Sequence, residues 1–149
     1  MGLDVIHSRP FNDDELIRIA QSEGRILLTR DKRIVERCTR KNAEQKDAID
    51  FLFIAEDLPF DQMVEVVSAF HIDPFENAFT RCAVCNASLL KRDKKEVAGR
   101  APPFVYANLN EYRECPTCER IYWHGSHREK IEKILGEVKN RAKELSSEG

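Results

Sequence analysis

Hydrophobic residues follow a helix-like spacing and then form two short continuous runs in the first half of the chain. Asn12 and Glu15 make a capping pattern at the start of a predicted helix, and Gly24 suits the end of that helix. An apolar run at residues 25–29 follows at once, and a second run occupies residues 49–55. Such runs are typical of buried strands in a parallel sheet.

Amphipathic helices are predicted after both runs. Ile34 and Cys38 lie on one face of the first helix, and Pro59 suits the first turn of the second. The alternation of helices and strands favours an α/β fold with a parallel sheet. Two strands are too few for an independent sheet of this kind, so either further strands lie in residues 3–7 and in the second half, or the chain begins partway into the domain. We predict one core containing Ile26, Leu27, Leu28, Phe51, Phe53, Val66 and Phe70.

The pattern changes from Phe79 onward. Short segments with paired cysteines lead to one long amphipathic helix over residues 127–145. The apolar side of this helix is expected to be buried and consists of Ile131, Ile134, Leu135, Val138, Ala142 and Leu145. We therefore predict two domains, residues 1–78 and residues 79–149.

Composition excludes several classes of protein. With 149 residues, 42% hydrophobic and 34% charged, the chain is neither collagen-like nor wholly disordered. No apolar run reaches the ~18–20 residues that span a bilayer, and the first ten residues lack the pattern of a secretory signal. Residues 1–78 hold 10 basic and 16 acidic residues, whereas residues 79–149 hold 14 and 10. The basic second half suits an anionic partner, although a solvated surface explains the excess equally well.

Four of the five cysteines form two matched pairs, Cys82 with Cys85 and Cys115 with Cys118. Two residues between the ligands let a tight turn aim both thiolates at one ion, and two such turns complete a tetrahedral shell. The spacing predicts a closed structural Zn²⁺ site, which holds a small module together and does no chemistry itself. A left-handed residue often follows the second cysteine of such a turn. Asn86 tolerates that conformation, and Glu119 is less comfortable in it.

Other interpretations of the cysteines stay open. The pairs are also compatible with two redox dithiols, with unligated thiols or with iron, and His124 or His127 could replace a cysteine as ligand. Cys38 is expected to be a small buried hydrophobic residue. Free cysteines without a secretory signal indicate a reducing, cytoplasmic environment.

Two carboxylates stand where α/β proteins place ligands. Asp31 follows the first predicted strand, and Asp13 begins the helix before it. Carboxylates gathered there could bind Mg²⁺ or Mn²⁺ for phosphoryl chemistry. Each residue alone is equally explained as a helix cap or a turn residue.

The stretch from Asn12 to Asp31 resembles the core of PIN-like nucleases. The wider series resembles the Mut-seven C-terminal domain family, a PIN-like ribonuclease domain followed by a zinc ribbon, over nearly the whole chain. The motifs that carry this second resemblance are Phe79-x-Arg81-Cys82-x-x-Cys85-Asn86, Pro102-Pro103, Cys115-Pro116-x-Cys118 and Tyr122-Trp123-x-Gly125-Ser126-His127.

This resemblance implies a three-layer parallel sheet, a Cys₄ zinc ribbon and a C-terminal helix. It also implies hydrolysis of RNA with Mg²⁺ or Mn²⁺ bound by Asp13 and Asp31. Family members begin with a strand ending in Asp and a basic helix, whereas this chain begins at Gly2-Leu3-Asp4. The resemblance therefore implies an N-terminally truncated sheet. The chain is expected to be a fragment, to have a mis-assigned start, or to be a short form with weak or absent activity. The alternatives are a non-catalytic zinc ribbon that binds RNA or the ribosome, and a protein-interaction domain.

Overall fold

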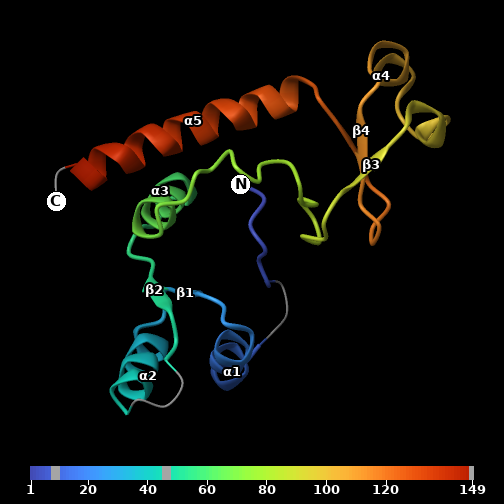
Figure 1. Cartoon of the computed structure of the whole chain (residues 1–149). Helices are drawn as coiled ribbons and strands as arrows, with labels where there is room; N and C mark the ends of the chain where they lie inside the picture. Colours follow the sequence, from blue (N-terminus) through green and yellow to red (C-terminus); the bar gives the residue numbers. More distant parts are fainter. Residues whose placement is uncertain (8–10, 45–47, 148–149) are drawn as a thin grey trace. The chain divides into compact units, whose positions relative to one another are not determined.

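The computed structural model describes residues 1–7, 11–44 and 48–147 (Figure 1). The chain forms two compact units. One unit is His7–Ile72, and the other combines Met1–Ile6 with Asp73–Gly149. The chain passes from one unit to the other after Ile6 and again after Ile72.

The first unit has the predicted alternation of helices and strands. Its elements are α1 (Asp13–Glu23), β1 (Leu27–Thr29), α2 (Lys32–Ala43), β2 (Phe51–Phe53) and α3 (Pro59–Ala69). The two strands are parallel, with Leu27 opposite Phe51 and Thr29 opposite Phe53. Residues 3–7, where a further strand was one option, form none. The described residues thus hold a small, two-stranded parallel sheet within a mixed α/β fold.

The ends of α1 are set by local hydrogen bonds. The Asn12 side chain accepts from the backbone N–H of Glu15 at 2.9 Å, and the Glu15 carboxylate accepts from the backbone N–H of Asn12 at 3.0 Å. At the other end Gly24 has a left-handed backbone, with φ of 60°. Both features confirm the predicted start and end of this helix.

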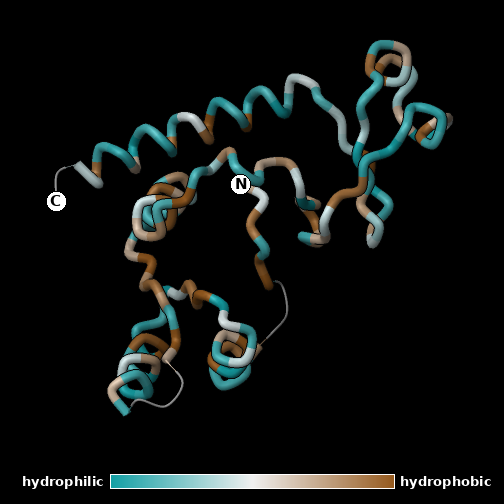
Figure 2. The backbone as a smooth tube through the Cα atoms, viewed as in Figure 1, coloured by the Kyte–Doolittle hydropathy of each residue, from teal (hydrophilic) through white to brown (hydrophobic). Residues whose placement is uncertain are grey.

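One apolar cluster joins α1, α2 and β1. Its buried members are Ile17, Ala20, Leu27, Ile34, Cys38 and Ile49. Figure 2 shows the strongly hydrophobic chain around β1 and β2. The predicted core is partly wrong: Leu27 is only 8% exposed, but its neighbours Ile26 and Leu28 are 44% and 46% exposed. Successive side chains of a strand point to opposite faces, and only the face toward α1 and α2 is covered.

The third helix differs from the prediction in the same way. Val64 and Val67 are its buried residues, whereas Val66 and Phe70 are only partly buried. Phe51 and Phe53 are also partly buried. Neither of the two residues of this helix region that we predicted in the core is fully buried.

We expect Leu27→Ala to lower the free energy of unfolding by about 2–5 kcal/mol, because it leaves a cavity between α1, α2 and the sheet. Leu28→Ala is the matched control on the same strand, and its half-exposed side chain should cost less than about 1 kcal/mol. Urea denaturation of the full chain followed by circular dichroism measures both. Equal losses for the two variants would contradict the burial pattern.

The second unit contains a three-stranded antiparallel sheet in the order β3-β4-β5. Its elements are β3 (Leu90–Arg92), the 3₁₀ helix η1 (Lys94–Val97), α4 (Pro103–Asn108), β4 (Tyr112–Glu114), β5 (Ile121–Trp123) and α5 (Ser126–Ser147). Val97, Ala101 and Tyr112 form its small core. Glu114 is buried and ion-paired with Arg92 at 2.6 Å and with Arg100, and these hydrogen bonds hold the pKa of Glu114 below its ordinary value.

The C-terminal helix buries part of its predicted apolar side. Leu135, Val138 and Ala142 are buried, as expected, but Ile134 and Leu145 are exposed. The hydropathy colouring along α5 in Figure 2 is mostly hydrophilic, with apolar positions at intervals. Within the described residues, none of the helices has both the length and the apolar character needed to cross a bilayer.

Candidate metal centre and acidic cluster

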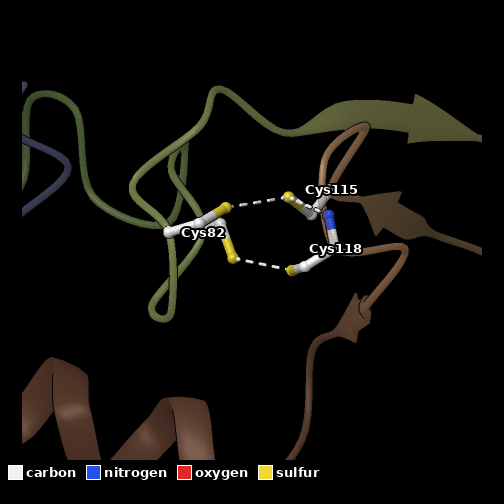
Figure 3. A group of neighbouring side chains, drawn as sticks. Cys82, Cys115 and Cys118 are labelled. Atoms are coloured by element: carbon white, nitrogen blue, oxygen red, sulfur yellow. Dashed lines mark hydrogen bonds between the residues drawn. The ribbon is translucent and has the colours of Figure 1, made fainter.

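The four paired cysteines meet at one point of the second unit. Their sulfur atoms all lie within 4.8 Å of one another. Sγ of Cys82 is 3.5 Å from Sγ of Cys118, and Sγ of Cys85 is 3.3 Å from Sγ of Cys115. Figure 3 shows the side chains of Cys82, Cys115 and Cys118 turned toward a common centre. The two pairs, 29 residues apart in the sequence, therefore make one four-sulfur group.

Two equivalent turns, which we call the first and second knuckles, present these sulfurs. In the first knuckle the backbone N–H of Asn86 donates to the carbonyl of Cys82 at 3.0 Å, and in the second Glu119 donates to Cys115 at 3.0 Å. Asn86 and Glu119 have φ of 61° and 57°. The left-handed conformation expected for Asn86 is confirmed, and Glu119 adopts it as well despite its larger side chain.

The distances fit a tetrahedral zinc shell. Zinc–sulfur bonds of about 2.3 Å place the sulfurs of such a shell about 3.8 Å apart, inside the range found here. The four cysteines could fill all four positions of such a shell, which is the arrangement of closed, structural sites. Among the described residues neither His124 nor His127 belongs to the group.

The environments of the four thiols shift their pKa values in different directions. Burial alone would raise the pKa of Cys82, but hydrogen bonds from the Tyr122 hydroxyl and from backbone N–H groups outweigh it and lower this pKa to about 6. The Tyr122 hydroxyl lies 3.1 Å from Sγ of Cys82 and accepts from the backbone N–H of Ala83 at 3.2 Å. In Cys118, a hydrogen bond from the backbone N–H of Arg120 lowers the pKa, but desolvation and the neighbouring thiols raise it more, to about 12. Tyr122 thus forms a hydrogen bond with the candidate ligand Cys82, a role that the sequence did not indicate.

The two predicted carboxylates lie in the first unit, at the ends of its elements. Asp31 follows β1 and caps α2, where its side chain accepts from the backbone N–H of Arg33 at 2.8 Å. Asp13 is the first residue of α1. The capping role of Asp31 does not preclude a second role for its carboxylate.

Two arginines of α2 join these carboxylates into what we call the acidic cluster: Asp13, Asp31, Arg33 and Arg37. Arg33 pairs with Asp31 at 3.2 Å, and Arg37 pairs with Asp13 at 3.4 Å and also with Asp14. Hydrogen bonding and charge from Asp31, together with the charge of Asp13, raise the pKa of Arg33. The same guanidinium therefore lies in the field of both predicted residues. The arginines were not predicted; their four-residue spacing on α2 was the available signal.

The acidic cluster offers two carboxylates to a cation. Hydrogen bonds from the side chain and backbone of Arg33 lower the pKa of Asp31, so its carboxylate is ionised at neutral pH. No third acidic or histidine ligand within the described ranges completes a group with Asp13 and Asp31. Mg²⁺ commonly binds one or two protein carboxylates and takes its other ligands from water and phosphate.

A four-cysteine cluster on a small antiparallel sheet fits a zinc ribbon, here attached to a parallel α/β unit. Residues 1–135 match the Mut7-C RNAse domain family, and the chain belongs to this family. The match confirms the resemblance found in the sequence motifs. No curated protein and no solved structure matches the chain.

Proposed function

We propose that this protein is a metal-dependent ribonuclease of the PIN-like type. The observation that carries the proposal is that Asp31 pairs with Arg33 and Asp13 with Arg37, one turn further along α2, in a chain that belongs to an RNAse domain family. Asp13 and Asp31 act as the catalytic carboxylates, and RNA is the substrate. The parallel sheet of the first unit then represents part of a three-layer PIN-like domain.

The roles of the residues follow from their charges. A bound Mg²⁺ or Mn²⁺ supplies Lewis-acid chemistry at a phosphodiester and lowers the pKa of an attacking water. Asp31, held by its capping hydrogen bond and kept ionised by Arg33, offers a positioned oxygen ligand. Asp13 offers a second. Arg33 and Arg37 balance the two negative charges and are suited to contact phosphate, because a guanidinium binds phosphate oxygens with two parallel hydrogen bonds.

The zinc centre has a different task in this proposal. It stabilises residues 79–149 as a structural domain beside the catalytic domain of residues 1–78. Four thiolate ligands and the buried free thiol of Cys38 suit a reducing, cytoplasmic environment.

The second candidate is a non-catalytic RNA-binding module. The observation that favours it is the pairing of both carboxylates with arginines, because Asp13 and Asp31 already have cationic partners and are less free to bind a metal ion. An incomplete cation site would then leave the basic zinc ribbon as the working part.

A cleavage assay separates the two candidates. Labelled single-stranded RNA is incubated with the zinc-loaded chain, freed of loosely bound ions by gel filtration, with Mg²⁺, with Mn²⁺ or without addition. We expect slow cleavage that occurs only after addition of either ion, because the cluster offers two carboxylates, with zinc content unchanged. Intact RNA that shifts with the protein on a native gel would support the binding module, and intact unshifted RNA would overturn both candidates.

A further inference from the structure

The side chain of Asn86 holds the extended segment at the start of the chain. Its Oδ1 accepts from the backbone N–H of Val5 at 2.9 Å, and its Nδ2 donates to the carbonyl of Leu3 at 3.0 Å. The two bonds pair the Val5 N–H and the Leu3 carbonyl in the way that a neighbouring strand would pair them. The side-chain amide therefore recognises the extended backbone from residue 3 to residue 5 without regard to its side chains.

Two further contacts add sequence requirements. Arg81 pairs with the carboxylate of Asp4 at 3.2 Å and donates to the carbonyl of Asn86 at 2.8 Å. Gly2 has φ of 73°, and a Cβ on it would lie 1.6 Å from the carbonyl oxygen of Asn77. Only glycine fits at this position, and an acidic residue suits the position two further on. The site is thus complementary to a Gly-x-Asp-x segment.

The position of Asn86 links this contact to the metal centre. Asn86 directly follows the ligand Cys85 and is itself part of the first knuckle, whose turn it closes onto the carbonyl of Cys82. Its left-handed backbone, which aims the amide at Leu3 and Val5, belongs to the folded knuckle. Such turns do not hold their conformation without the ion, because binding and folding of a structural zinc site are coupled.

The second knuckle is an internal comparison. Glu119 occupies the corresponding position, with nearly the same φ of 57° and the same backbone hydrogen bond. Among the described residues its side chain makes no hydrogen bond, so the knuckle geometry alone does not require one.

We propose that the zinc-loaded first knuckle is a binding site for residues 2–5, and that zinc occupancy decides whether this segment is held. The segment leads directly into His7–Ile72, and Asp73 resumes the zinc-binding unit. Zinc therefore holds the segment that directly precedes the unit carrying the acidic cluster. This inference depends on the four-cysteine zinc site and not on ribonuclease activity.

The test measures hydrogen exchange of the Val5 amide by NMR in the full-length chain, with zinc content determined on the same samples. Asn86→Gly removes both bonds to the segment, and with them the 3.4 Å bond that Oδ1 accepts from Arg81, but keeps a residue that accepts positive φ. We expect it to speed exchange at Val5 about tenfold, with zinc still near one ion per chain. Glu119→Gly, the matched control in the second knuckle, should leave Val5 exchange unchanged. Removal of zinc from the wild-type chain should release Val5 to the same extent or more.

A variant within residues 2–5 tests the same contact by changing the bound segment and leaving the first knuckle unchanged. Gly2→Ala cannot keep its approach to Asn77, so Val5 should exchange as fast as in Asn86→Gly while the knuckles keep their zinc. The proposal is overturned if Val5 is equally protected with and without zinc, or if neither variant changes its exchange. It is also overturned if the purified chain holds no zinc.

Discussion

Cys115→Ser is expected to reduce the zinc content from one ion per chain to below about a fifth of that value and to unfold the zinc ribbon. Cys115 is fully buried, and its sulfur lies 3.3 Å from that of Cys85. A serine hydroxyl does not replace a thiolate ligand, so the shell loses a quarter of its bonds. Structural zinc contributes about 10–16 kcal/mol of apparent binding free energy to small domains, and the core of this unit is too small to replace that contribution.

Elemental analysis and amide exchange measure the two effects. Exchange should rise across residues 79–126, while Leu27 and its partners in the β1–β2 sheet stay protected. Cys38→Ala is the control, because it also removes one thiol but lies in the core of the other unit and should keep zinc at one ion per chain. A Cys115→Ser protein that folds and retains zinc would disprove the four-cysteine assignment.

Asp31→Asn is expected to lower the rate of metal-dependent RNA cleavage at least ~10²-fold. Changes to residues that only support metal ligands already cost about 10–100-fold, and Asp31 is proposed as a ligand itself. An amide carries no negative charge, so it binds Mg²⁺ or Mn²⁺ more weakly. The readout is the initial rate on labelled RNA at saturating Mn²⁺.

The choice of asparagine separates catalysis from folding. Asn caps helices as well as Asp does, so the hydrogen bond to the backbone N–H of Arg33 can be kept. The lost pair with the exposed side chain of Arg33 contributes little to stability. Asp14→Asn is the control, since it also removes a negative charge that pairs with Arg37, but Asp14 is 86% exposed and is not one of the proposed ligands. The nuclease proposal fails if Asp31→Asn cleaves like its parent, or if Asp14→Asn is equally impaired at an unchanged melting temperature.

Local interactions explain what could be predicted. The capping hydrogen bonds between Asn12 and Glu15, the left-handed Gly24 and the first-turn Pro59 depend on neighbours within a few residues, so their residue types suffice to predict them. The grouping of the four cysteines was predictable for a similar reason, because the two-residue spacing within each cysteine pair reflects the turn that aims both thiols at one point. The parallel pairing of β1 and β2 followed from the alternation of elements.

Long-range packing decided the rest. Ile26 and Leu28 are as apolar as Leu27, and only the placement of α1 and α2 on one face of the strand determines which of the three is buried. The field that Arg33 shares with Asp13 and Asp31 depends on α2 lying beside α1, which no spacing encodes. The contact of Asn86 with Leu3 and Val5 joins residues more than 80 positions apart. The sequence alone thus determined the helices, the strands and the grouping of the four cysteines. The partners of the other side chains were decided by the tertiary structure, because contacts between distant segments depend on how the whole chain packs.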